Sequence, residues 1–169
     1  MSRLVDFYRG KATDTEGRYL QDIWTWPDDD LEAVHDFIQW LFPLPEPSRF
    51  NPDAPLLTQK DIEAFQADEH LRQNLRKSFE RILTFLGLTQ TADGKIVAGP
   101  NFAARKSDVW AMPNHNWLRI TRILRSLTLL GLPDEAKMFF GWLEESYRQR
   151  RFPIDAGTFG YWRGAIAES

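Results

Sequence analysis

The sequence of 169 residues has 21 lysines and arginines, 24 aspartates and glutamates, seven tryptophans, twelve phenylalanines and no cysteine. The missing cysteine excludes thiolate nucleophiles, disulfides and cysteine-bound zinc, and the net charge of −3 excludes an overall basic surface for nucleic acid. The start lacks the apolar run of a signal peptide, and no stretch of about 20 apolar residues could span a bilayer, so we expect a soluble, cytoplasmic protein.

The first predicted helix covers residues 4–10, and a polar turn region follows at 14–22. Residues 26–42 predict one longer helix, which Pro43 ends. Its apolar residues recur at spacings of three and four, the mark of one helical face: Leu31, Val34, Ile38 and Leu41. Three consecutive aspartates at its start complement the positive end of the helix dipole, which explains them better than a metal site does. Five prolines within 43–55 predict an extended connector.

Two further helices are predicted in the middle of the chain. Thr58 and Asp61 resemble a capping box that opens a helix through Phe65. Asp68 caps the next helix, which Gly87 closes. Its apolar face consists of Leu71, Leu75, Phe79, Ile82, Leu83 and Leu86.

An Asp-Gly pair between two short β-prone runs predicts a hairpin at about residues 88–98. A two-stranded hairpin is marginally stable alone, so it must lean on the helices. A short helix is expected at 101–111, and Asn114 caps the following one, which Gly131 ends. The apolar face of that helix consists of Ile120, Ile123, Leu124, Leu127 and Leu130.

The last two predicted helices cover residues 133–150 and 155–167. Inward-facing residues of the first are expected to be Met138, Phe139, Trp142 and Leu143. The second has a stripe of small residues: Ala156, Gly160, Gly164 and Ala167. Since glycine costs about 1 kcal/mol against alanine in an exposed helix, we expect another helix to pack on this stripe and Gly160→Leu to overpack. The whole chain, 1–169, is therefore predicted as one all-α domain, a multi-helix bundle with one small hairpin.

The charges fall into two blocks of opposite sign. Residues 21–48 contain seven acidic residues and no lysine or arginine. Residues 101–132 contain one acidic residue and five basic ones: Arg105, Lys106, Arg119, Arg122 and Arg125. We expect the helices in the two blocks to dock, with Arg119 or Arg122 near a carboxylate of the first block. The alternative is that these arginines form a site for an anion or a peptide carboxylate.

Two long motifs, HDFIQWLFPL and LRITRILRSLTLLG, stand in this order together with FYRG, APLLTQKDIEAF and the His-Asn pair at 115 and 116. In these motifs the chain, from about Phe7 to Arg150, resembles the conserved region of the opioid growth factor receptor family. The resemblance implies a peptide- or protein-binding domain, because the eukaryotic receptor is a peptide receptor associated with the nucleus. We expect a stand-alone version of this domain.

The predicted binding site is a groove between the two motif helices. Seven residues are expected to bind the ligand there: His35, Gln39, Trp40, His115, Asn116, Arg119 and Arg122. Structural roles compete at single positions. His35 suits a core-edge histidine, and Trp40 suits packing under the proline-rich connector. The arginines at 148, 150 and 151 suit the negative end of a helix, and the alternative for them is a local contact with an acidic group or a nucleic acid.

The sequence is also compatible with two other functions. A small-molecule-binding or hydrolytic site would use His35, His115 and Arg119. No Gly-rich phosphate loop, G-x-S-x-G or H-E-x-x-H supports an enzyme, so no catalytic residue, metal or cofactor is predicted. The other possibility is a structural module that forms a homodimer through an exposed apolar patch. No nucleic-acid partner is expected.

Overall fold

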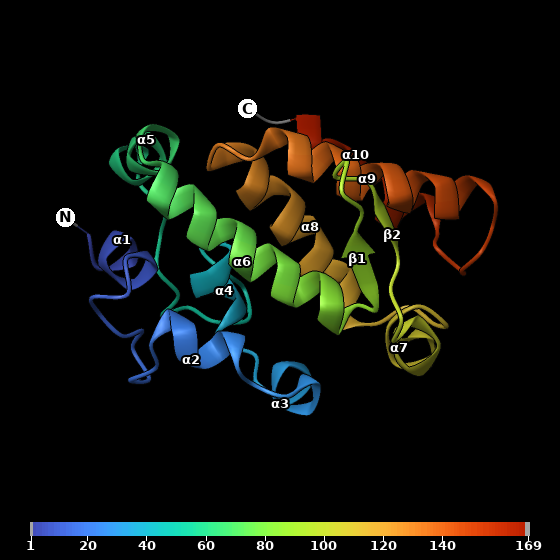
Figure 1. Cartoon of the computed structure of the whole chain (residues 1–169), viewed down its shortest axis with the longest axis horizontal. Coiled ribbons are helices and arrows are strands. Elements are labelled where there is room, and N and C mark those ends of the chain that lie inside the picture. Colours follow the sequence, from blue (N-terminus) through green and yellow to red (C-terminus); the bar gives the residue numbers. More distant parts are fainter. Residues whose placement is uncertain (1, 168–169) are drawn as a thin grey trace. The chain divides into compact units, whose positions relative to one another are not determined.

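Helices dominate the computed structural model, which describes residues 2–167 (Figure 1). The one sheet within these residues is a two-stranded hairpin, so the predicted all-α class with a small hairpin is confirmed. Packing divides the chain into an N-terminal unit and a C-terminal unit, with the boundary between Phe79 and Glu80 inside helix α6 (Glu69–Phe85). No helix of the described part is long and apolar enough to cross a membrane.

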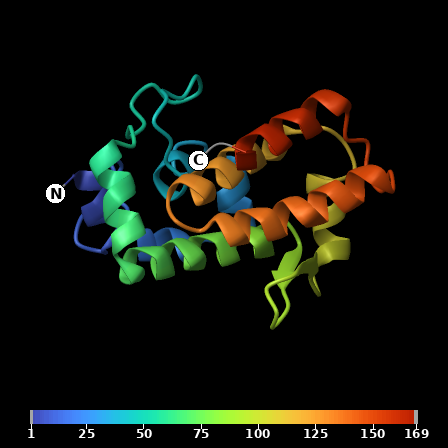
Figure 2. The same ribbon diagram turned by 90° about the horizontal axis from the view of Figure 1, so that it is seen from above.

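The N-terminal unit contains mostly short helices. They are α1 (Arg3–Tyr8), α2 (Leu20–Trp24), α3 (Asp28–Ala33), α4 (Ile38–Leu41), α5 (Gln59–Ala67) and the first part of α6. Helix α1 lies against α5 (Figure 2), where the ring centroids of Tyr8 and Phe65 are 5.2 Å apart. Phe7 packs on Trp40 with the same 5.2 Å separation. Aromatic side chains therefore form much of the core of this unit.

The prediction of one helix over residues 26–42 is wrong. The chain forms α3 and α4 instead, and Val34 between them has an extended backbone with φ −90° and ψ 130°. The break places the carboxylate of Asp36 2.9 Å from the guanidinium of Arg18. Residues 37–42 are all buried, so several sides of this segment face the interior, which a single amphipathic helix would not allow.

Residues 14–22, predicted as a polar turn region, include the start of α2. The turn itself is confined to 14–18, where Gly17 has φ +78°. At the start of α2 the Asp22 carboxylate accepts the backbone N–H of Tyr19 at 2.9 Å. A helix of five residues is too short to produce a periodic pattern that the sequence could reveal.

The predicted helix caps are confirmed at the starts of α5, α6 and α8, where the capping residue lies next to the helix in the sequence. Thr58 and Asp61 form the expected capping box at the start of α5. The Asp68 carboxylate accepts a backbone N–H in the first turn of α6 at 2.9 Å, and Asn114 caps α8. The predicted apolar face of α6 is buried throughout: Leu71, Leu75, Phe79, Ile82, Leu83 and Leu86.

The C-terminal unit contains the hairpin and the longer helices. Its elements after α6 are β1 (Leu88–Gln90), β2 (Ile96–Ala98), α7 (Phe102–Val109), α8 (His115–Leu129), α9 (Pro133–Arg148) and α10 (Ala156–Ala167). Helices α8, α9 and α10 pack on one another, and β2 lies against α9 (Figure 2). The strands are antiparallel, with Thr89 opposite Val97, and Gly94 takes φ +87° in the turn.

Two expectations about this unit are wrong. Met138 was expected to face inward, but 43% of it is exposed. The small residues of α10 face solvent, and a Cβ added at Gly160 or Gly164 would have no atom of another described element within 4 Å. Helix α10 instead buries its other face, which consists of Phe159, Trp162 and Ala165. The stripe is therefore not a helix-packing surface, and Gly160→Leu would not overpack.

Candidate ligand-binding site

Three of the seven predicted site residues lie in the N-terminal unit. His35 is exposed in the segment between α3 and α4. Gln39 and Trp40 of α4 are buried, with exposed fractions of 4% and 3%. Gln39 Oε1 accepts a hydrogen bond from Asn51 Nδ2 of the proline-rich connector at 3.4 Å, and Trp40 packs on Phe7. Gln39 and Trp40 thus have interior contacts within their own unit.

The other four predicted residues lie on α8 in the C-terminal unit. His115 is the exposed first residue of the helix, and Arg122 is half-buried. Asn116 is fully buried, and its Oδ1 accepts a hydrogen bond from Arg119 Nη1 at 3.3 Å. The structure therefore brings Asn116 and Arg119 together. The expected contact of these α8 residues with His35, Gln39 and Trp40 stays a prediction.

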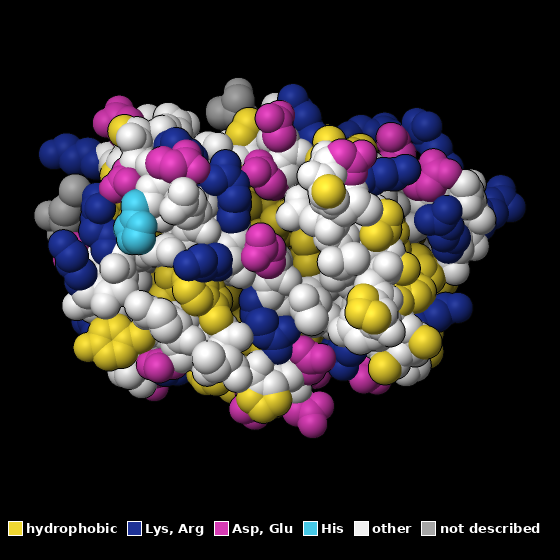
Figure 3. Space-filling model, viewed as in Figure 1, with side chains coloured by type: hydrophobic (Ala, Val, Ile, Leu, Met, Phe, Trp, Pro, Cys, Tyr) yellow, Lys and Arg dark blue, Asp and Glu magenta, His cyan; other side chains and the backbone are white. Residues whose placement is uncertain are grey.

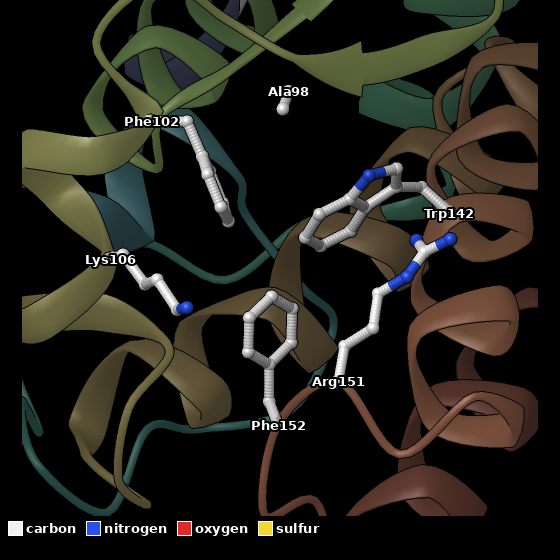
Figure 4. Close-up of a pocket in the computed structure, with 6 residues that line it drawn as sticks. All are labelled: Ala98, Phe102, Lys106, Trp142, Arg151 and Phe152. Atoms are coloured by element: carbon white, nitrogen blue, oxygen red, sulfur yellow. The ribbon is translucent and has the colours of Figure 1, made fainter.

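A pocket that the motifs did not indicate opens in the C-terminal unit, with a volume of about 360 Å³. Its lining comes from β2, α7, α9 and the chain after α9: Ala98, Phe102, Lys106, Trp142, Arg151 and Phe152. Figure 4 shows the rings of Phe102, Trp142 and Phe152 around a common space, with Lys106 extending into it from α7. We call these six residues the aromatic pocket.

The three rings are close neighbours with different orientations. Phe102 lies 6.3 Å from Trp142 and 6.1 Å from Phe152, measured between centroids, and Trp142 lies 5.9 Å from Phe152. Trp110 is fully buried beside them, 4.9 Å from Trp142 and 5.4 Å from Phe152. Phe102 and Trp142 are half-buried, so an apolar ligand group would remove ring surface from water, at about 25 cal/mol per Å².

Hydrogen bonds to the end of α6 hold the α7 side of the pocket. Arg105 Nε donates to the carbonyl of Phe85 at 2.7 Å, and the Arg105 guanidinium lies 4.7 Å from the Phe85 ring. Trp110 Nε1 donates to the carbonyl of Leu86 at 2.8 Å. Both buried bonds tie the α7 segment to the end of α6, which holds the backbone that carries Phe102 and Lys106 beside the pocket.

A second hollow of about 690 Å³ adjoins the aromatic pocket and shares Arg151 and Phe152 with it. It is lined by Tyr147, Arg148, Arg150, Arg151, Phe152, Pro153 and Ile154. We call the three arginines the arginine turn. Hydrophobic and basic side chains are intermixed where α7 and the end of α9 lie, on the right of the face in Figure 3.

Arg150 has an unusual backbone conformation. It follows the end of α9 with φ +52°, and it is the one non-glycine residue with positive φ in the described part of the chain. Its N–H bonds to the carbonyl of Tyr147 at 3.1 Å, and the next N–H bonds to the carbonyl of Ser146 at 3.0 Å, which is a Schellman motif. Helices α1, α6 and α8 have glycine with positive φ at their ends: Gly10, Gly87 and Gly131. An L-residue here costs roughly 1–2 kcal/mol relative to glycine.

The basic groups around the two hollows differ in their partners. Arg148 pairs with Glu144 at 3.2 Å. Arg151 donates from Nη2 to the amide oxygen of Gln149 at 2.8 Å, and no carboxylate within residues 2–167 forms an ion pair with it. Within residues 2–167, no carboxylate forms an ion pair with Lys106 or Arg150, and both side chains are exposed.

Sequence patterns provide little indication of the aromatic pocket. Its three rings come from residues far apart along the chain, and each of them also suits an ordinary core position. The negative end of α9 is sufficient to explain the positions of Arg148, Arg150 and Arg151, so these residues do not by themselves indicate a binding site. One sequence feature could have suggested a binding role: Arg150 stands after the end of α9, at a position where glycine is usual.

Comparisons with known proteins agree with the motifs. The family model of the opioid growth factor receptor (OGFr) conserved region matches residues 3–166. The opioid growth factor receptor of Rattus norvegicus is 38% identical over 156 residues, covering 88% of this chain and 27% of the relative. The human receptor is 36% identical over 157 residues, covering 88% and 23%. Opioid growth factor receptor-like protein 1 of Xenopus tropicalis is 34% identical over 156 residues, covering 87% and 30%.

No solved structure matches the chain. The matched region spans about a quarter of the length of the curated receptors. The matched residues 3–166 cover all but the ends of the two units, together with all the motifs and both hollows. The chain therefore belongs to the family defined by the opioid growth factor receptor conserved region.

Proposed function

We propose that the protein is a peptide-binding module and that the aromatic pocket binds an apolar side chain of the peptide. The observation that carries the proposal is the open space between the rings of Phe102, Trp142 and Phe152. Pockets for small ligands occupy roughly 300–1,000 Å³, so a volume of about 360 Å³ suits one bulky side chain better than a large cofactor.

Two further features support a peptide ligand. The pocket continues into the neighbouring hollow, which gives an extended chain room to either side of a buried anchor. The rat and human relatives are named opioid growth factor receptor, and that name favours binding over catalysis. The alternative is that the ligand binds at the motif residues, which are His35, Gln39 and Trp40 in the N-terminal unit and His115, Asn116, Arg119 and Arg122 in the C-terminal unit.

The test is a selection from a random peptide library on the immobilised protein, with opioid growth factor as a defined peptide beside it. Selected peptides are then measured against Ala98→Phe. Ala98 is exposed and lines the pocket, so a phenyl ring there fills the space without removing any packing. We expect binding to weaken by at least about tenfold, because the anchor loses its site.

Ala92→Phe is the matched control, because Ala92 is an exposed residue of the hairpin turn that does not line the pocket. This variant should bind like the wild-type protein. Both variants should keep the wild-type melting temperature. Selected peptides that bind Ala98→Phe as tightly as Ala92→Phe would show that the aromatic pocket is not the binding site, and a failure to select any peptide would contradict the proposed function itself.

A further inference from the structure

We infer that the ligand of the aromatic pocket is acidic, with carboxylates beside its apolar anchor that bind Lys106 and the arginine turn. This inference rests on the proposed function and names the class of peptide that the site accepts. It assigns a ligand-binding role to Lys106 of α7 and to arginines whose position at the end of α9 is otherwise explained by the negative end of that helix.

The first support is the placement of the charges. Lys106 lines the aromatic pocket on the α7 side, and Arg151 lines it on the α9 side (Figure 4). Arg148 and Arg150 continue the basic surface into the adjoining hollow. An anchor seated between the rings would therefore have basic groups on both sides, within reach of flanking acidic residues.

The second support is the lack of internal carboxylate partners. Among the described residues, no ion pair holds Lys106 or Arg150, although the chain has more acidic than basic residues. Within residues 2–167, the Arg151 guanidinium donates to the neutral amide oxygen of Gln149 and to no carboxylate. Exposed guanidinium groups next to an apolar pocket are suited to bidentate binding of an incoming carboxylate.

The third support is the conformation of Arg150. Other helix ends of this chain place glycine at positive φ, whereas α9 places an arginine at φ +52°. The left-handed conformation is unfavourable for any side chain, and the Arg150 side chain forms no ion pair within the described residues that could offset it. Strain of this kind occurs at binding sites, where the side chain serves a ligand at the expense of stability.

An acidic peptide fits these observations better than a nucleic acid does. Single-stranded nucleic acids need flat stacking surfaces for successive bases. The rings here are inclined to one another by 77°, 52° and 35°, which forms a pocket rather than a series of platforms. The net charge of −3 also disfavours a polyanion that extends beyond the site.

The experiment measures the peptides selected above, their counterparts with glutamine and asparagine in place of glutamate and aspartate, and oligothymidylate. Binding is compared for the wild-type protein, Arg150→Gly, Lys106→Gln and the control Lys137→Gln, an exposed residue of α9 away from both hollows. We expect the acidic peptides to bind at least about tenfold more tightly than their neutral counterparts, with the difference reduced at high salt.

Arg150→Gly and Lys106→Gln should each reduce the preference for acidic peptides by about threefold or more, and Lys137→Gln should leave it unchanged. Arg150→Gly should not lower the melting temperature, because glycine suits its backbone conformation. Neutral peptides that bind equally well, but lose binding in Ala98→Phe, would overturn the inference and leave the proposed function intact. Oligothymidylate that binds more tightly than any peptide and depends on Arg150 would also overturn it. A failure to select peptides would instead overturn the proposed function.

Discussion

Tyr8 shows how a single buried polar group stabilises the N-terminal unit. Its ring is fully buried, and its hydroxyl donates to the carbonyl of Leu41 and lies 3.0 Å from Ser78 Oγ. Trp24 Nε1 donates to the same serine oxygen at 2.9 Å. Since a phenol has one hydrogen, Ser78 must donate to Tyr8, and the bonds form a chain from the indole to the carbonyl.

Burial raises the pKa of the Tyr8 phenol well above its ordinary value of about 10, and the hydrogen bond from Ser78 opposes this shift only in part. The folded protein therefore retains a proton that the unfolded chain loses above about pH 10, so this group contributes stability below that pH, and the contribution falls as the pH rises further.

We predict that Tyr8→Phe lowers the free energy of unfolding by roughly 1–3 kcal/mol at neutral pH, because it removes the donor to the Leu41 carbonyl and the acceptor for the Ser78 hydroxyl proton. The deficit should shrink above about pH 10, where the wild-type protein loses the contribution of Tyr8. Urea unfolding of both proteins at neutral and alkaline pH measures the difference. If Tyr8→Phe lowers the free energy of unfolding by the same amount at neutral and alkaline pH, the raised pKa of Tyr8 is contradicted.

Among the elements, α10 has the most unexpected surface. Gly160 lies in the middle of the helix with open space where its Cβ would be. Because glycine has more backbone freedom to lose, Gly160→Ala should stabilise the protein by about 1 kcal/mol, measured by thermal or chemical unfolding. Gly87→Ala is the contrasting variant, since Gly87 has φ +83° and its Cβ would lie 3.1 Å from the Cα of Phe102. It should destabilise the protein, and equal effects of the two variants would contradict this account.

The elements differ in how far the sequence could predict them. The starts of α5, α6 and α8 depend on capping residues next to them in the chain, and these were predicted correctly. The break between α3 and α4 depends on contacts with distant residues, such as the ion pair between Asp36 and Arg18, which no local pattern reveals. The small-residue stripe of α10 was misjudged because small residues suit both a close helix contact and an exposed face, and this helix buries Phe159, Trp162 and Ala165 instead.

At the scale of the whole molecule, the two family motifs fall into different units. HDFIQWLFPL forms α4 and its flanks in the N-terminal unit, and LRITRILRSLTLLG forms most of α8 in the C-terminal unit. The aromatic pocket lies outside both motifs, so motif-based reasoning predicted the family correctly but not this site. The composition was equally uninformative about the arginine turn, because a net charge of −3 hides a local cluster of opposite sign.

Photo-cross-linking is the measurement that tests the central claim most directly. A selected peptide would have a benzophenone group beside its apolar anchor, and mass spectrometry would identify the modified residues after irradiation. Our account predicts adducts within 98–106 and 142–152, the segments that line the aromatic pocket. Adducts confined to 35–40 or 115–122 would contradict it and would place the ligand at the motif residues instead.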